Sequence, residues 1–262
     1  MKHHGQLDKA KIKQSFAAAA GSYDAVAALQ RQVGLDLLKK CPLQAEAGWV
    51  VDLGAGTGFL TRALAVAEHQ SLLALDIALP MLLNSRQKNQ SIDVDYLCAD
   101  AEKLPLANAS VQQIYSNLAL QWCEDLLAVF ADCRRVLQHD GQLVLATFGP
   151  ATLKELKAAW SKVDDFTHVN QFYSLHDING FLQQAGFSDL SLESVIYQTQ
   201  YASVMDLMHE LKGLGAHNVS QSRNRKPTTR QQLQQMIQHY EHAMPDGQVI
   251  ASYEIIFVRS VR

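Results

Sequence analysis

Residues 49–58 read WVVDLGAGTG, an apolar run that ends in an acid and in three glycines at alternate positions. A short and continuously apolar run of this kind is typical of a strand buried on both faces of a parallel sheet. The glycines let the backbone turn tightly and approach a ligand, because no Cβ atom stands in the way. The stretch therefore predicts a strand and a ligand-binding turn at the carboxyl edge of a sheet, where open α/β folds bind their ligands.

The spacing of the glycines distinguishes two kinds of ligand. A dinucleotide-binding turn has the pattern G-x-G-x-x-G and holds a pyrophosphate, whereas Gly54, Gly56 and Gly58 give G-x-G-x-G. Asp52 precedes them, and a carboxylate repels a pyrophosphate but attracts a ligand ammonium group. Asp76, 18 residues after Gly58, ends the next expected strand and can accept hydrogen bonds from ribose hydroxyls. The pattern favours S-adenosylmethionine and disfavours an NAD-dependent oxidoreductase.

Helices and strands alternate along the chain on both sides of this turn. Periodicity predicts two helices within residues 15–40, ahead of the turn. After it, the expected strands are residues 71–75, 94–98, 111–116 and 142–147, and the expected helices are residues 60–68, 79–88 and 125–137. This alternation predicts an α/β, Rossmann-like fold: a mostly parallel sheet with helices on both faces.

Beyond residue 150 the alternation gives way to helical additions and two further strands. The expected helices are residues 153–163, 175–184, 204–214 and 230–242, and the expected strands are residues 190–201 and 249–261. We interpret the chain as a single domain, with an N-terminal helical cap (1–44), a cofactor-binding core (45–150) and a substrate-side part that holds a lid and the C-terminal strands (151–262). The lid is expected to come from helical additions near residues 150–175 and 203–245.

The composition excludes several classes of protein. A net charge of −3 over 262 residues does not suit a chain that coats nucleic acid. No apolar stretch approaches the roughly 20 residues of a membrane span, and residues 1–16 lack the apolar centre of a signal peptide. The four cysteines form no zinc-binding pattern, and Cys98, in an apolar run, is expected to be a buried core thiol. We expect a cytoplasmic protein without a metal, a nucleic-acid partner or a membrane.

Several segments resemble those of the class I S-adenosylmethionine-dependent methyltransferases. They are residues 50–58, residues 73–76 followed by Met81 and Leu82, residues 99–105 and residues 136–143. The resemblance implies a seven-stranded sheet with one antiparallel strand near its edge, to which residues 249–261 could contribute. It also implies contacts to the cofactor, with Asp100 at the adenine amino group. The residues implied are Asp52, Gly54, Ala55, Gly56, Gly58, Asp76, Ile77, Asp100, Ala101, Asn117 and Leu118.

A finer resemblance extends over nearly the whole chain, to the malonyl-acyl-carrier-protein O-methyltransferases of biotin synthesis. Its segments are residues 18–24 with 29–30, 116–122, 147–150 with 152–156, 168–170 and 210–218. The resemblance implies methyl transfer from S-adenosyl-L-methionine to the free carboxylate of malonyl-acyl-carrier protein, with S-adenosyl-L-homocysteine as the second product. The methyl ester would start pimeloyl assembly, and the malonyl-bearing carrier protein would be the partner.

Such a reaction requires the protein to position the substrate against the methyl donor. It needs no general base, because a carboxylate with a pKa of roughly 4 is ionised at neutral pH. Tyr23 and Gln121 are the candidates for positioning, although Tyr23 could equally be a helix-face aromatic packed on the sheet. The candidate substrate contacts in the helical additions are His168, Asn170, Lys212, His217 and Asn218.

Residues 222–230 hold four positive charges and no acid. They form either a solvated loop that enters a helix or a docking patch for an acidic carrier protein, with Arg223, Arg225 and Lys226 as its docking residues.

Two other functions stay open. The chain could be a class I methyltransferase that acts on a free small molecule, such as a quinone precursor or a dicarboxylic acid. It could also be a non-catalytic module that binds the cofactor without transferring the methyl group.

Overall fold

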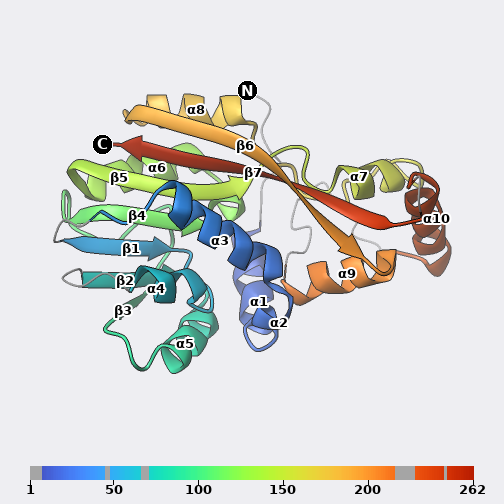
Figure 1. Cartoon of the computed structure of the whole chain (residues 1–262), viewed down its shortest axis with the longest axis horizontal. Coiled ribbons are helices and arrows are strands. Elements are labelled where there is room, and N and C mark those ends of the chain that lie inside the picture. Colours follow the sequence, from blue (N-terminus) through green and yellow to red (C-terminus); the bar gives the residue numbers. More distant parts are fainter. Residues whose placement is uncertain (1–7, 45–47, 66–70, 216–227, 245–246) are drawn as a thin grey trace.

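The computed structural model describes residues 8–44, 48–65, 71–215, 228–244 and 247–262. In these residues one seven-stranded sheet has the order β3-β2-β1-β4-β5-β7-β6 (Figure 1). The strands are β1 (Trp49–Leu53), β2 (Ser71–Asp76), β3 (Asp95–Cys98), β4 (Val111–Asn117), β5 (Leu137–Phe148), β6 (Ser188–Tyr201) and β7 (Val249–Val261). Strands β1 to β5 pair in parallel, and β7 runs antiparallel to both β5 and β6. The expected mostly parallel sheet is confirmed, with its antiparallel strand one place from the edge.

Helices cover both faces of the sheet because successive side chains of a strand point to opposite faces. Val51 and Leu53 of β1 pack into a core with α6 (Leu126–Val136) and α8 (Leu175–Gln184). Val50 points the other way, into a core with α3 (Ala28–Lys40) and α4 (Phe59–Leu64). Helix α5 (Leu79–Lys88) packs on β2 and β3. Burial on both faces explains the continuous apolar runs at residues 50–51 of β1 and 72–75 of β2.

The N-terminal part folds as three helices and not as the two expected from its periodicity. They are α1 (Lys9–Ala19), α2 (Tyr23–Val26) and α3. Asp8 caps α1 by accepting a hydrogen bond from the Lys11 backbone N–H. The break between α2 and α3 falls at Ala27, whose backbone leaves the helical region (φ −90°, ψ 37°). No glycine or proline marks that position, so the sequence pattern gives no sign of it.

The helical additions gather beyond the carboxyl ends of the parallel strands, at the far end of the long β6–β7 ribbon (Figure 1). They are α7 (Lys154–Trp160), α9 (Val204–Gly213) and α10 (Arg230–His242). Helix α10 contacts α7 and α9, and α9 also contacts α2 and β6. The cap and these additions therefore enclose the same edge of the sheet. None of the described helices is long and apolar enough to cross a bilayer.

The expected ranges of β1, β7, α5, α8 and α10 agree with the structure residue for residue. The expectation for Cys98 was wrong, because this cysteine is exposed. It ends β3, and β3 is the edge strand of the sheet. Its thiol contacts the Ile77 carbonyl at 3.6 Å. Position within a sheet, which periodicity does not reveal, decides whether an apolar run is buried.

Candidate functional site

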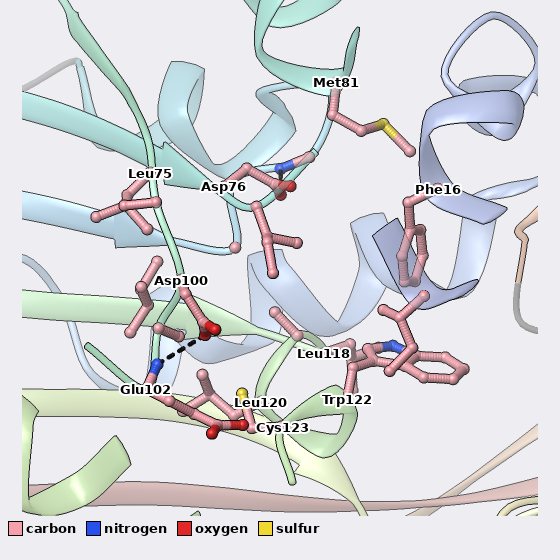
Figure 2. A pocket seen from close by; sticks show the side chains of 18 of the residues that line it. Phe16, Leu75, Asp76, Met81, Asp100, Glu102, Leu118, Leu120, Trp122 and Cys123 are labelled. Carbon is pink, nitrogen blue, oxygen red and sulfur yellow. Dashed lines mark hydrogen bonds between the residues drawn. The ribbon is translucent and has the colours of Figure 1, made fainter. Parts of the chain in front are cut away.

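Two adjoining pockets open at the carboxyl ends of β1, β2 and β4. The wide pocket is lined mainly by apolar side chains and by the carboxylates of Asp76, Asp100 and Glu102. Figure 2 shows the carboxylates along one side of this pocket, and the rings of Phe16 and Trp122 along the other. The two rings meet edge to face, with centroids 5.4 Å apart. The narrow pocket lies beside the glycine turn, and both pockets share Tyr23, Gly54, Gly56 and Asn117 as lining residues.

The three glycines of the turn have different structural roles. Gly54, Gly56 and Gly58 all have positive φ angles, at 79°, 53° and 81°, which favour glycine. A Cβ on Gly56 would meet no atom within 4 Å, so its backbone is bare toward the pockets. A Cβ on Gly58 would lie 2.1 Å from Ser85 Oγ. Gly58 lines neither pocket, and its lack of a side chain allows the turn to pack closely against α5, while its contact with the cofactor stays a prediction.

Asp76 links the end of β2 to the glycine turn. Its Oδ2 accepts from the Gly56 backbone N–H at 2.9 Å, and its Oδ1 accepts from the Ala78 N–H at 2.8 Å. Burial raises the pKa of Asp76, against the opposing effect of these N–H donors. Ile77, the next residue, also lines the wide pocket. The carboxylate is thus held rigidly at the rim of the wide pocket, where it can accept hydrogen bonds from a pair of hydroxyls.

Asp100 lines the same pocket and forms an ion pair with Lys9 of α1. Its Oδ2 receives Lys9 Nζ at 2.8 Å, and the same ammonium lies 2.7 Å from Glu102 Oε2. Asp100 Oδ1 accepts from the Glu102 N–H at 3.0 Å (Figure 2). Burial acts to raise the pKa of Asp100, but the Lys9 charge and these hydrogen bonds outweigh it and lower the pKa. Ala101 lines the pocket beside them.

The narrow pocket holds a different set of charges. Arg31 of α3 and Asp52 of β1 both line it. Arg31 Nη1 donates to the Asp24 carbonyl at 2.7 Å, which orients the guanidinium. Asp52 is 1% exposed and accepts a hydrogen bond from Thr61 Oγ1 at 2.6 Å. Burial, reinforced by the Asp76 charge, raises the pKa of Asp52 to about 7.

Unpartnered acceptor oxygens also belong to the narrow pocket. Gln30 Oε1 and Asn117 Oδ1 are buried and have no hydrogen-bond partner among the described residues, and both side chains line this pocket. Asn117 Nδ2 is engaged with the Gln30 carbonyl at 2.8 Å. A buried acceptor without a donor costs free energy, so these oxygens fit a ligand that brings N–H groups. Arg31 and Gln30 were not among the residues expected from the sequence.

Tyr23 and Asp24 fix the cap onto the turn. Tyr23 lines both pockets, and burial together with the charges of Asp76 and Asp24 raises its pKa, so the hydroxyl stays protonated. Asp24 accepts from Thr57 Oγ1 at 2.5 Å and pairs with Lys88 Nζ at 2.6 Å. Ala55, expected at the cofactor, lines the narrow pocket.

A cavity of about 440 Å³ adjoins both pockets. It shares Trp122 with the wide pocket and Gln30 with the narrow one. Its wall is mostly apolar and comes from the cap, from α7 and the segment after it, from α9 and from β7. The expected substrate residues His168, Asn170 and Lys212 all line it. This volume lies in the range of ligand-binding cavities.

Two expected residues need more comment. His168 stacks on Trp160 with ring centroids 3.7 Å apart, and its Nε2 lies 2.7 Å from Asp164 Oδ1. Gln121 lines none of the three spaces. Its Nε2 donates to the Leu118 carbonyl at 2.6 Å, and its Oε1 accepts from Thr147 at 3.3 Å. These hydrogen bonds support the turn that carries Leu118, and the positioning role expected for Gln121 stays a prediction.

Leu118 itself has the strained backbone of a functional turn. Its φ angle is 51°, in the left-handed region that a leucine rarely adopts. It directly follows β4, is 7% exposed and lines the wide pocket. The expected residues His217, Asn218, Arg223, Arg225 and Lys226 lie outside the described residues.

The chemistry of the pockets matches the parts of S-adenosylmethionine. The wide pocket is mainly apolar, and its carboxylates, among them those of Asp76 and Asp100, can accept hydrogen bonds, so it suits an adenosine. The narrow pocket, with a guanidinium, a buried acid and two unpartnered acceptors, suits the carboxylate and the ammonium of an amino acid. No group of three or more His, Cys, Asp and Glu side chains that could hold a metal occurs in the part of the chain that the structure describes. Fold and site together define a class I S-adenosylmethionine-dependent methyltransferase.

Comparison with known proteins agrees with this class. Residues 51–145 match the methyltransferase domain family. The malonyl-[acyl-carrier protein] O-methyltransferase of Methylovorus sp. is 40% identical over 96% of this chain and 88% of that protein. The enzyme of the same name from Methylococcus capsulatus is 41% identical over 95% of this chain and 92% of that protein. The chain belongs to the malonyl-[acyl-carrier protein] O-methyltransferase family.

Other similar proteins are longer or more distant. The biotin biosynthesis bifunctional protein BioHC of Cellvibrio japonicus is 40% identical over 96% of this chain, which spans 50% of that protein. Among solved structures, the YcgJ protein from Bacillus subtilis has a TM-score of 0.63 at 18% identity, with 88% of this chain and 97% of that chain covered. Haemonchus contortus phosphoethanolamine N-methyltransferase 2, solved with S-adenosyl-L-methionine, has a TM-score of 0.59 at 14% identity, with 94% and 57% covered. These two structures support the fold.

Proposed function

We propose that this chain transfers a methyl group from S-adenosyl-L-methionine to the free carboxylate of malonyl-acyl-carrier protein, which gives the malonyl methyl ester that starts pimeloyl assembly in biotin synthesis. The names of its relatives support the substrate. The observation that carries the proposal is the cavity that meets the cofactor pockets at Trp122 and Gln30. An acyl group on a long arm can enter this cavity and present its end to the methyl donor.

The proposal divides the site residues between the two parts of the cofactor. Asp76 accepts the ribose hydroxyls, Asp100 accepts from the adenine amino group, and Ile77, Ala101 and Leu118 provide apolar contact. In the narrow pocket Arg31 binds the cofactor carboxylate, while its ammonium donates to the oxygens of Gln30 and Asn117 and lies near Asp52. Residues 1–44 act as the cap, 45–150 hold the cofactor and 151–262 shape the substrate side of a single domain.

The reaction requires the protein to position the substrate and the cofactor, and it does not require a proton transfer. S-adenosylmethionine supplies an electrophilic methyl group on a sulfonium. The attacking carboxylate is ionised at neutral pH, so no side chain has to remove a proton. Water is excluded from the reacting groups by the side chains of Tyr23, Leu118 and Trp122. This desolvation makes the carboxylate a better nucleophile. Burial raises the pKa of Cys123, which lines the wide pocket, so its thiol does not compete for the methyl group.

The carrier protein is the proposed partner, and Arg223, Arg225 and Lys226 are its proposed docking residues. Carrier proteins that are acidic are attracted to such a cluster, which speeds encounter. Because carrier-bound malonyl groups belong to fatty-acid synthesis, we propose a cytoplasmic location, and the four cysteines are all free thiols, in keeping with a reducing compartment.

The test is a methyl-transfer assay with S-adenosylmethionine labelled in its methyl group. Malonyl-carrier protein, malonyl-coenzyme A and free malonate are offered in parallel, and the label is checked for lability to base, which a methyl ester shows. The proposal expects base-labile label on the carrier-bound malonyl group, far above free malonate. Label on a free acid instead would indicate a small-molecule methyltransferase, and tight binding of the cofactor without labelled product would indicate a binding module.

A further inference from the structure

A chain of hydrogen bonds lies in and behind one wall of the cavity of about 440 Å³ into which the acyl group is proposed to enter. Tyr201 Oη donates to Glu210 Oε1 at 2.8 Å, and the hydroxyls of Tyr201 and Tyr253 lie 3.0 Å apart. Tyr253 of β7 and Glu210 of α9 line the cavity, whereas Tyr201, at the end of β6, does not. Tyr253 is 3% exposed. Its hydroxyl therefore lies where water is largely excluded, and each buried donor and acceptor there needs a hydrogen-bond partner.

Counting protons fixes the direction of this chain. A carboxylate has no proton to give, so the single proton of Tyr201 lies toward Glu210. The 3.0 Å contact between the tyrosines must then use the proton of Tyr253. Burial and neighbouring groups raise the pKa of both tyrosines, so neither hydroxyl ionises near neutral pH. The oxygen of Tyr253 is left with lone pairs only, and it can accept a hydrogen bond but cannot donate one.

A second acceptor without a partner lies in the same cavity. Asn170 is 8% exposed, lines the cavity, and has no hydrogen-bond partner at its Oδ1 within the described residues. Leaving a buried acceptor unpaired costs free energy, so this oxygen also fits an incoming donor. The Phe148 ring, which also lines the cavity, has its centroid 6.2 Å from that of Tyr253.

We propose that Tyr253 Oη and Asn170 Oδ1 recognise amide N–H groups of the arm that carries the acyl group. The inference rests on the proposed function, in which the substrate is a thioester on a carrier protein. The pantetheine arm of such carriers has two amides, and each brings one N–H donor. The unpartnered oxygens of Tyr253 and Asn170 suit these donors and discriminate against an arm that has acceptor atoms in place of the N–H groups.

The same wall also disfavours binding of the malonyl carboxylate beside it. Glu210 is an anion, and the oxygens of Tyr253 and Asn170 present lone pairs, so a carboxylate placed here would be repelled. The cavity meets the cofactor pockets at Trp122 and Gln30, each of which lines the cavity and one of these pockets. In the proposal the amides of the arm bind Tyr253 and Asn170, and the malonyl carboxylate stays free to reach the methyl donor.

The test uses carrier proteins that differ in one atom of the arm. Malonyl-carrier protein is prepared with the natural arm, and with each amide N–H in turn replaced by an ester oxygen, and kcat and KM are measured for methyl transfer. For the wild type, one replacement should lower kcat/KM about tenfold, mainly through KM, because a buried hydrogen bond is lost. Tyr253→Phe should lower kcat/KM for the natural arm about tenfold and be insensitive to that same replacement.

Tyr201→Phe is the matched control, because it removes a hydroxyl from the same chain but keeps the Tyr253 oxygen in the cavity. Its kcat/KM for the natural arm should stay within about threefold of the wild-type value. The inference is overturned if Tyr253→Phe weakens every arm by the same factor, or if Tyr201→Phe is as damaging as Tyr253→Phe, since both results indicate structural damage. A wild-type protein that transfers no methyl group to the natural arm would refute the proposed function itself, and the inference with it.

Discussion

The ammonium of Lys9 lies 2.8 Å from the carboxylate of Asp100, although the two residues are 91 positions apart in the chain. Lys9 belongs to α1, and Asp100 follows β3. Partial burial disfavours the charge of Lys9, but the hydrogen bonds and charges of Asp100 and Glu102 outweigh it and raise the pKa. One ion pair therefore ties the N-terminal cap to the residue expected at the adenine ring.

Lys9→Ala should weaken the binding of S-adenosylhomocysteine by about two- to fivefold, because a partly exposed ion pair contributes little but helps to hold α1 over the pocket. Added salt should weaken binding to the wild type and have less effect on the variant, since salt screens exposed charges. Titration calorimetry at low and high salt measures both. Lys11→Ala is the control, because Lys11 lies on the same helix and its ion pair among the described residues is a local one with Asp8, at 3.4 Å. Equal salt dependence in all three proteins would contradict the prediction.

Arg31→Met should weaken binding of S-adenosylhomocysteine by about 10- to 100-fold, because it removes a charged partner of the ligand carboxylate. Methylthioadenosine has the adenosine part but no amino-acid part, and its affinity should change by less than about twofold. The comparison separates loss of a contact from a general loss of structure. Arg86→Met, at an exposed position of α5, should change neither affinity. If both ligands lost affinity for Arg31→Met alike, the narrow pocket would not be the site of the carboxylate.

The parts of this site that sequence reasoning found are those encoded locally. Gly54 and Gly56 follow a buried strand in a fixed pattern, and Asp76 ends the next strand, so parallel pairing of β1 and β2 brings them together. Helices α8 and α10 were expected at their observed bounds, and each begins with a capping box, at Ser174 and at Thr229.

The parts that were missed depend on tertiary placement. The site gains Lys9, Gln30 and Arg31 because α1 packs on α5, and α3 packs on α4, β4 and β5. Sequence spacing carries no sign of these contacts. The same reason explains Cys98, whose exposure follows from the position of β3 at the edge of the sheet. The hydrogen bond from Gln121, a candidate for positioning, to the Leu118 carbonyl is another contact that the sequence pattern does not reveal.

Asp52 should release a proton when the cofactor binds. Its pKa is raised to about 7, so in the free protein it is largely protonated at pH 6. The nearby ligand ammonium favours the carboxylate and lowers this pKa, so affinity should rise as the pH increases toward 7 and level off above it. Calorimetry in buffers of different ionisation enthalpy counts the protons released. Asp52→Asn should abolish this release, whereas Asp95→Asn, at an exposed position, should leave it unchanged.

The same raised pKa has a consequence for stability. An unfolded aspartate titrates near pH 4, so between about pH 4 and pH 7 the unfolded chain loses this proton while the folded protein keeps it. The contribution of Asp52 therefore lowers the free energy of unfolding as the pH rises through this window, by at most on the order of 4 kcal/mol, and is constant above it. Denaturant unfolding of the wild type and Asp52→Asn should show a difference that grows from pH 4 to pH 7. A difference independent of pH would contradict the raised pKa.

Neutralising the proposed docking residues should affect encounter with the carrier protein and not the cofactor. Replacing Arg223, Arg225 and Lys226 by Gln should raise KM for malonyl-carrier protein and reduce the salt dependence of kcat/KM, because fewer charges steer the encounter. The affinity for S-adenosylhomocysteine should stay within about twofold.

The control for this variant replaces three exposed cations elsewhere, Lys13, Lys39 and Arg86 on α1, α3 and α5, and so removes the same net charge. If the effect comes from net charge alone, both triple variants raise KM equally. If residues 222–230 form only a solvated loop, KM and its salt dependence match the wild type. An increase in KM confined to the first variant, with kcat for saturating carrier unchanged, would place the acidic partner at this segment, because the loss would then lie in association and not in the chemical step.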